Sequence, residues 1–192
     1  MLEGVCAASR LPPLLPDEVR RRLEHEKTFT SKADVAVVDQ LYRSFFEGAT
    51  RFATRLDFSA LAWGNEQAGQ LADMLPSFAA LTTLDLSRNK LGAAGAAAVA
   101  KYVSVSGSLT NFSLENNNLG EQGTKSICEA LKVNKSIMEL NLSGGHPNYN
   151  NIGGPAGARH VADMLRANGS LTSVRAWPSN STEHTQLQTR CA

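Results

Sequence analysis

Short runs in which hydrophobic and polar residues alternate recur at a fixed spacing along this chain. The runs Leu81-Thr-Thr-Leu-Asp-Leu, Leu109-Thr-Asn-Phe-Ser-Leu and Ile137-Met-Glu-Leu-Asn-Leu begin 28 residues apart. Leu171-Thr-Ser-Val-Arg-Ala follows later, and Ala53-Thr-Arg-Leu-Asp-Phe lies one period earlier. Alternation with a period of two predicts a strand with one buried face. The pattern therefore predicts five equivalent strands.

A second shared block follows three of these runs and predicts a helix in each repeat. The blocks read Asn89-Lys-Leu-Gly-Ala-Ala-Gly95, Asn117-Asn-Leu-Gly-Glu-Gln-Gly123 and, after an insertion, Asn150-Asn-Ile-Gly-Gly-Pro-Ala-Gly157. Apolar residues then recur at helical spacing, as in Ala96, Val99 and Val103. We interpret the asparagines as turn residues that satisfy backbone groups, and the glycines as turn residues without the Gly-Lys-Ser/Thr ending of a phosphate-binding loop.

These repeated residues resemble the leucine-rich repeat, in particular its ribonuclease-inhibitor-like type with a period near 28 residues. The resemblance implies an α/β fold, a right-handed leucine-rich-repeat solenoid shaped as a short horseshoe, with an inner parallel β-sheet and outer helices. The first repeat departs from the pattern, because Leu61 and Trp63 stand at its asparagine and leucine positions. The repeats are expected at 53–80, 81–108, 109–136, 137–170 and, in part, 171–177.

The segments outside the array predict a helical cap at one end and no helical pattern at the other. Residues 17–52 are expected to form a helical N-terminal cap, with 33–52 covering the first repeat and residues 1–16 flexible. Residues 178–192 form a polar C-terminal tail. A solenoid end without a cap exposes core side chains. A truncated product, a cap built by the tail, and a partner covering the edge all remain open.

Composition and charge narrow the class of protein. Hydrophobic residues make up 42% of the 192 residues, and the formal charge is +1, too small for a dedicated nucleic-acid-binding surface. No apolar run is long enough for a membrane span. Glu3 and three early prolines disfavour a signal peptide, and three distant cysteines fit no disulfide framework. We expect a cytoplasmic protein, monomeric unless copies associate through the uncapped C-terminal edge.

The sequence contains no grouping of residues that is typical of a catalytic or metal-binding site. The four histidines lack a partner at helical spacing and a nearby cysteine. Cys128 lies at an inward helical position, where a small buried side chain explains it better than a nucleophile does. We expect no cofactor, no metal and no enzymatic activity.

The residues that alternate with the buried leucines form the candidate binding surface. This concave face would present polar side chains for a protein partner, whose identity the sequence does not give. It consists of Arg55, Asp57, Asp85, Asn111, Ser113, Glu115, Glu139, Asn141, Arg175 and Trp177. Trp177 and Arg175 are of the types that dominate interface energies, although Trp177 could instead cover the last repeat. The insertion in the fourth repeat adds His146 and Tyr149 on the rim as further candidates.

Three functions fit these observations, and the first is favoured. It is a non-catalytic protein-protein interaction module that binds its partner on the concave face. The second is a GTPase-activating regulator similar to the Ran-activating family, although that family has more repeats and an acidic C-terminal region. The third is a fragment of a larger nucleotide-binding, leucine-rich-repeat sensor, although no nucleotide-binding loop is present in these residues.

Overall fold

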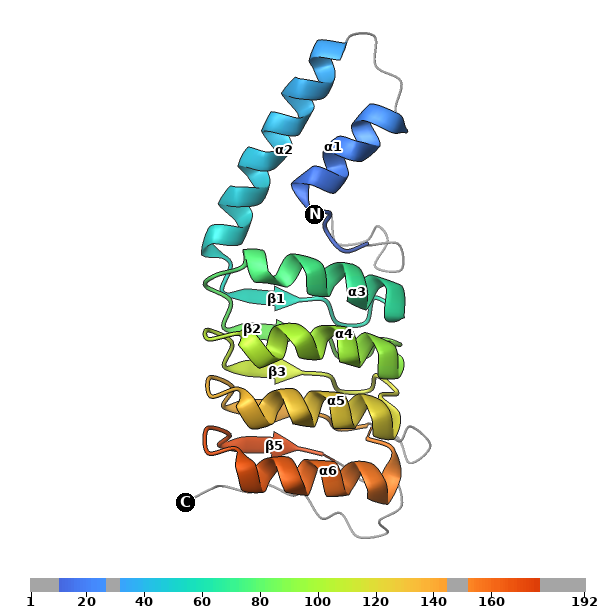
Figure 1. Ribbon diagram of the computed structural model, residues 1–192, viewed down its shortest axis with the longest axis vertical. Helices are drawn as coiled ribbons and strands as arrows, with labels where there is room; N and C mark the ends of the chain where they lie inside the picture. Colours follow the sequence, from blue (N-terminus) through green and yellow to red (C-terminus); the bar gives the residue numbers. More distant parts are fainter. Residues whose placement is uncertain (1–10, 27–31, 145–151, 177–192) are drawn as a thin grey trace, which may run out of the picture.

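The computed structural model describes residues 11–26, 32–144 and 152–176, and it shows a column of stacked strand-helix units (Figure 1). One parallel sheet has the strand order β1-β2-β3-β4-β5. Its strands are β1 (Arg55–Asp57), β2 (Thr83–Asp85), β3 (Asn111–Ser113), β4 (Glu139–Asn141) and β5 (Ser173–Arg175). The helices of the column are α3 (Asn65–Met74), which continues into the short 3-10 helix η2 (Leu75–Ser77), α4 (Gly92–Val105), α5 (Gly120–Val133) and α6 (Gly154–Ala167).

The strands pair in the register that the repeat predicts. Leu84 aligns with Leu56 on one side and with Phe112 on the other. Leu140 aligns with Val174 although the insertion separates them by more than one period. Each strand therefore turns the same residue of its run toward the helices, and the insertion leaves the stacking unchanged.

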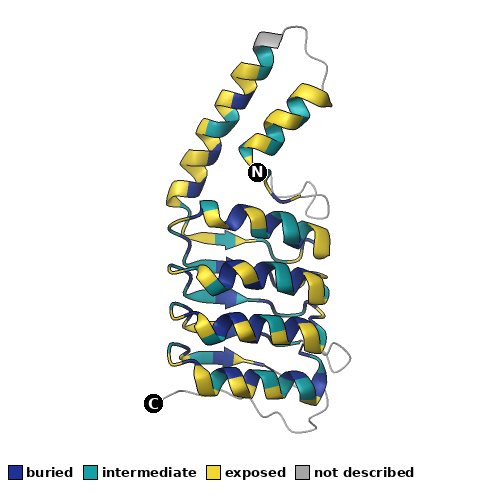
Figure 2. Cartoon of the chain, in the orientation of Figure 1, coloured by how far each residue is buried: buried dark blue, intermediate teal, exposed yellow. Residues whose placement is uncertain are grey.

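The hydrophobic core lies between the sheet and the helices. Leu86, Leu114 and Leu142 follow three successive strands and are fully buried. Val99 of α4 and Ile127 of α5 are also fully buried and belong to the same core cluster. Figure 2 shows that buried residues are concentrated in the stacked column of strands and helices. Each repeat thus contributes the buried side chains of its strand segment and of one helix face, and stacking the repeats joins them into a continuous core.

Buried asparagines bind the backbone at the turns that follow β2 and β3. The Oδ1 atom of Asn89 accepts hydrogen bonds from the backbone N–H groups of Leu61 and Trp63, both at 3.0 Å, and its Nδ2 atom donates to the carbonyl of Phe58 at 2.8 Å. Asn117 makes the equivalent donation to the carbonyl 31 positions earlier. The interpretation of these residues as structural is confirmed.

A second pair of asparagines binds the backbone at the turns after α5 and α6, where each of these helices leads to the next strand. Asn134 is buried, donates to the carbonyl of Val103 at 2.8 Å and accepts from the backbone N–H groups of Ser136 and Ile137, both at 2.9 Å. Asn168 repeats this arrangement in the next repeat. Both ends of the unit are therefore held by amide side chains.

The glycines of the repeat have two different roles. Gly92 and Gly120 are the first residues of α4 and α5, and their φ angles of 57° and 62° form the left-handed turn into each helix, in agreement with the predicted role in a turn. Gly95 and Gly123 lie inside helices instead, and the prediction that they are turn residues is wrong. A Cβ on Gly95 would stand 3.0 Å from the Cβ of Ala68, which shows that neighbouring helices approach too closely there for a side chain.

The N-terminal helices project from the column. α1 (Pro16–His25) packs along α2 (Lys32–Phe52), and α2 leads away from the sheet instead of lying across it (Figure 1). The prediction that residues 33–52 cover the first repeat is therefore wrong for most of the helix. Residues 11–15 are also placed, with Pro12 buried and the Leu14 carbonyl accepting from the Tyr42 hydroxyl at 2.7 Å, so the flexible segment predicted for 1–16 does not extend this far.

The last helix differs from the internal ones on the side where a further repeat would follow. Ala100 and Cys128 are buried against the next helix, whereas the equivalent Ala162 of α6 is exposed.

Among the described residues, no helix is both long and apolar enough to cross a membrane.

Candidate functional site

The candidate site is the face of the sheet that points away from the helices, which we call the open face. The first and third residues of each strand point to it because the middle residue points to the core. The open face contains a hollow of about 370 Å³. Its polar lining is Arg55, Thr83, Asp85, Ser87, Asn111, Ser113, Glu115, Glu139, Asn141, Ser173 and Arg175.

The structure brings together eight of the predicted site residues in this lining. Asp57 lies beside it, and its carboxylate is 3.4 Å from the Arg55 guanidinium. Trp177, His146 and Tyr149 fall outside the described residues. The described part of the predicted concave face thus forms one contiguous surface.

Two hydrogen bonds cross between neighbouring repeats and orient the central carboxylates. Asn111 donates through Nδ2 to Glu139 Oε2 at 2.7 Å, and Asn141 donates through Nδ2 to Glu115 Oε2 at 3.0 Å. Each carboxylate is held by an amide from a neighbouring repeat. Glu115 Oε1 also accepts from Asn116 Nδ2 at 3.1 Å, so Glu115 is fixed through both oxygens. A carboxylate oxygen can accept more than one hydrogen bond, so both groups can still accept from a ligand.

A repeated local turn uses part of the polar surface for the fold itself. Asp57 Oδ1 accepts from the Ser59 hydroxyl at 2.7 Å and from the Ser59 backbone N–H at 3.1 Å. Asp85 accepts from the backbone N–H of Ser87 at 2.9 Å. Asn141 accepts in the same way two residues before a serine. These residues were predicted only as contact residues, and the structure adds a role in ending the strand.

The hydrogen bonds to Asp57 also fix its charge. Three groups hold the pKa of Asp57 below its ordinary value. The hydrogen bond from the Ser59 hydroxyl has the largest effect, the Ser59 backbone N–H adds to it, and the Arg55 guanidinium contributes less. Asp57 is therefore ionised at neutral pH.

Four carboxylates follow one another across the strands, with Arg55 and Arg175 at the two ends of the row. They belong to Asp57, Asp85, Glu115 and Glu139.

The chemistry available on the open face is recognition by hydrogen bonds and charge. Its polar lining consists of carboxylates, amides, hydroxyls and two guanidinium groups, and the described lining contains neither histidine nor cysteine. Across residues 11–26, 32–144 and 152–176, no group of three His, Cys, Asp or Glu side chains is placed to hold a metal ion. Cys128 lies in the core, and burial raises the pKa of its thiol to about 12.

The strand alternation that predicts Asp85 on this face also predicts Ser87 there, two residues later, and the structure shows Ser87 in the lining of the hollow although it is buried. The sequence pattern did not predict that the core-facing residues Leu84, Phe112 and Leu140 also line the hollow. Alternation gives only the side of the strand on which a residue lies, so it contains no signal for these three contacts.

Of the comparisons with known proteins, the one with solved structures supports the fold. No protein-family model matches the sequence, and no curated protein matches it. Among solved structures 41 chains match, and one of them is Leiomodin-1 Actin-Binding Site 2. That structure has a TM-score of 0.61 at 17% sequence identity, and the match covers 86% of this chain and 81% of that chain. The chain therefore has the fold of a stacked α/β repeat protein.

Proposed function

We propose that this protein is a non-catalytic protein-binding module whose ligand lies on the open face. The observation that carries the proposal is the row of carboxylates held in place by hydrogen bonds. Those of Glu115 and Glu139 are held by amide side chains of neighbouring repeats, and those of Asp57 and Asp85 by serines two residues later. Preorganised acceptors cost little further ordering when a ligand binds. The proposal includes the finer expectations of a ribonuclease-inhibitor-like repeat, a right-handed horseshoe with the open face as its concave side, and a cytoplasmic location.

The charges on the open face define the kind of ligand that it fits. Asp85, Glu115 and Glu139 stand in the middle of the hollow, so a lysine or arginine side chain of the partner would meet them. Arg55 and Arg175 at the ends would meet acidic residues of the same partner. We therefore propose a protein segment with a basic centre and acidic flanks. Actin is the first named protein to test, since the structural neighbour is an actin-binding site.

The test compares binding by the wild type with binding by a variant of the open face. The variant Asp85→Lys, Glu115→Lys, Arg175→Glu reverses three charges in the hollow. The matched control, Glu66→Lys, Asp73→Lys, Lys101→Glu, makes the same net change at exposed positions of α3 and α4. Each protein is immobilised, exposed to purified actin and, separately, to cell lysate, after a cooperative thermal transition has shown that it is folded.

The proposal expects a partner that the wild type and the helix-face control both capture and that the open-face variant loses. Since surface charges carry this contact, its affinity should also fall as salt concentration rises. A partner that all three proteins capture equally would contradict the open face as the site. Loss in the control as well would indicate that the charge change itself, and not its position, controls binding.

A further inference from the structure

A row of large hydrophobic side chains is exposed along α2. Leu41 is 66% exposed, Phe45 71% and Phe52 74%, and Val37 and Val38 extend the row toward the start of the helix. We call these five side chains the α2 stripe. Figure 2 shows α2 exposed along most of its length, beyond the end of the column. The exposed area is about 500 Å², from aromatic and aliphatic side chains of about 150–250 Å² each, which is large for a monomer surface.

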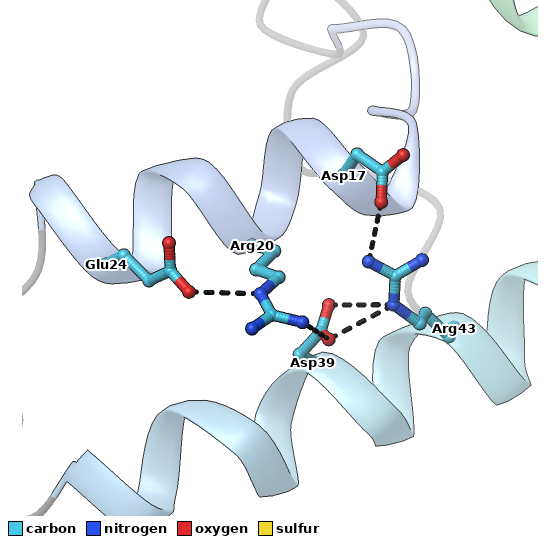
Figure 3. Close-up of polar contacts among 5 residues, drawn as sticks. All are labelled: Asp17, Arg20, Glu24, Asp39 and Arg43. Carbon is cyan, nitrogen blue, oxygen red and sulfur yellow. Dashed lines mark hydrogen bonds and ion pairs between the residues drawn. The ribbon is translucent and has the colours of Figure 1, made fainter.

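The opposite side of the same helix is fixed to α1. Arg43 donates to Asp17 at 2.7 Å and to both oxygens of the buried Asp39 at 3.1 Å, and Arg20 lies 3.8 Å from Asp39 (Figure 3). The Phe46 side chain is also buried on this side. α2 is thus held on one side and uncovered on the other, so the α2 stripe is a stable feature of the surface.

The spacing of the α2 stripe is that of a helix which pairs with another helix. Four of its side chains, those of Val38, Leu41, Phe45 and Phe52, form a row with Gly48 between the last two, and Val37 lies beside this row. The five positions of the row are separated by three, four, three and four residues, which is the spacing of the core positions of a coiled coil. A Cβ on Gly48 would meet nothing within 4 Å, so this position leaves an open gap in the row. A large side chain from a facing helix fits such a gap.

The charges beside the α2 stripe permit a copy of the same helix to approach. Gln40 and Ser44 are uncharged, and Glu47 and Arg51 have opposite charges. Two such surfaces do not repel each other, and the whole chain has a net charge of only +1. A membrane-surface helix instead carries many Lys and Arg residues on its polar side.

We propose that the α2 stripe is the interface of a homodimer, in which α2 of one copy packs antiparallel against α2 of a second. The antiparallel direction follows from Phe52, because β1 begins three residues later and a parallel pair would bring the two columns to the same end. Pairing two copies removes about 1,000 Å² from water, at the lower limit for a specific interface, so we expect a weak dimer that dissociates on dilution. The dimer differs from the monomer that the sequence led us to expect.

Sedimentation equilibrium of the full chain, from low to high micromolar concentration, tests the proposal. The variant Leu41→Glu, Phe45→Glu places charges in the α2 stripe. The control Ala36→Glu, Ala94→Glu places the same charges at exposed positions outside it, one on α2 and one on α4. Wild type and control should fit a monomer-dimer equilibrium, whereas the stripe variant should dimerise roughly 100-fold more weakly or not at all. Equal helicity by circular dichroism establishes that the variants are folded.

Other outcomes overturn the proposal. A wild type that stays monomeric at every concentration excludes the second copy, and flotation of that monomer with phosphatidylcholine vesicles would assign the α2 stripe to a lipid surface. A stripe variant that dimerises like the wild type places the interface elsewhere. If the stripe variant unfolds, the milder Phe45→Ser replaces it, and dimerisation unchanged by this substitution also overturns the proposal.

Discussion

Replacing Asn89 by alanine should strongly destabilise the protein, although the side chain is small and lies in a turn. The residue is only 4% exposed. Its loss removes the acceptor of the Leu61 and Trp63 N–H groups and a donor to the Phe58 carbonyl. An orphaned buried group costs about 1–3 kcal/mol, so we expect a loss of roughly 3 kcal/mol in the free energy of unfolding. Urea denaturation followed by circular dichroism measures it.

Replacing Asn89 by aspartate refines the same prediction, because aspartate retains Oδ1 but places a second oxygen where Nδ2 donates. That oxygen would face the carbonyls of Phe58, Leu86 and Ser87, so only the protonated acid can fit. The pKa of Asp at this position should therefore be raised in the folded state. A raised pKa gives stability that is complete below the unfolded value of about 3.9 and is lost as pH rises through the folded value.

The control for both variants is Asn111→Ala on the open face, where the lost hydrogen bond to Glu139 is exposed. We expect it to cost less than about 1 kcal/mol. The reasoning is refuted if Asn89→Ala costs no more than Asn111→Ala. It is also refuted if the difference in stability between the wild type and the aspartate variant is the same at pH 4 and pH 7.

Three further predictions follow from the packing. Truncating the fully buried Leu114 to alanine should lower the free energy of unfolding by about 2–5 kcal/mol, as measured by urea denaturation. The control Ser113→Ala, one residue away on the open face, should lower it by under about 1 kcal/mol. Equal losses in the two variants would contradict the strand orientation. Gly69→Ala should raise the melting temperature, since a Cβ there meets nothing within 4 Å, whereas Gly123→Ala should lower it because the Cβ would lie 3.1 Å from the backbone of α4. In a variant whose other two cysteines are serine, Cys128 should react with a thiol reagent at pH 8 only at the rate of unfolding, and rapid labelling of the folded protein would refute its burial.

The repeat made most of the column predictable from sequence. Each unit contacts only its neighbours, so the local alternation around Leu84 or Phe112 also specifies the tertiary contact. The five strands and their register followed from this. The close approach of helices at Gly95 and Gly123 did not, because a glycine in a turn and a glycine at a helix contact look the same in a single sequence.

The arrangement of α2 was the main error, and its cause is visible in the helix itself. Phe46 on the covered side and Phe45 on the uncovered side belong to one broad apolar arc. Periodicity shows that such an arc exists, but it does not show that α1 covers one half and leaves the other uncovered. On the open face, the alternation along each strand predicted which residues point outward. It did not predict the hydrogen bond between Glu115 and Asn141, because that bond depends on side-chain geometry.

The asparagines at the helix-to-strand turns make the protein incompatible with glycosylation at those positions. Asn134 and Asn168 each begin an Asn-x-Ser acceptor sequence, and the nitrogen that would carry the sugar is the one that donates to buried backbone carbonyls. A glycan attached before folding would prevent both turns from closing. Expression through a secretory pathway should therefore yield a glycosylated chain that fails to fold, while the same chain made without oligosaccharide transfer folds.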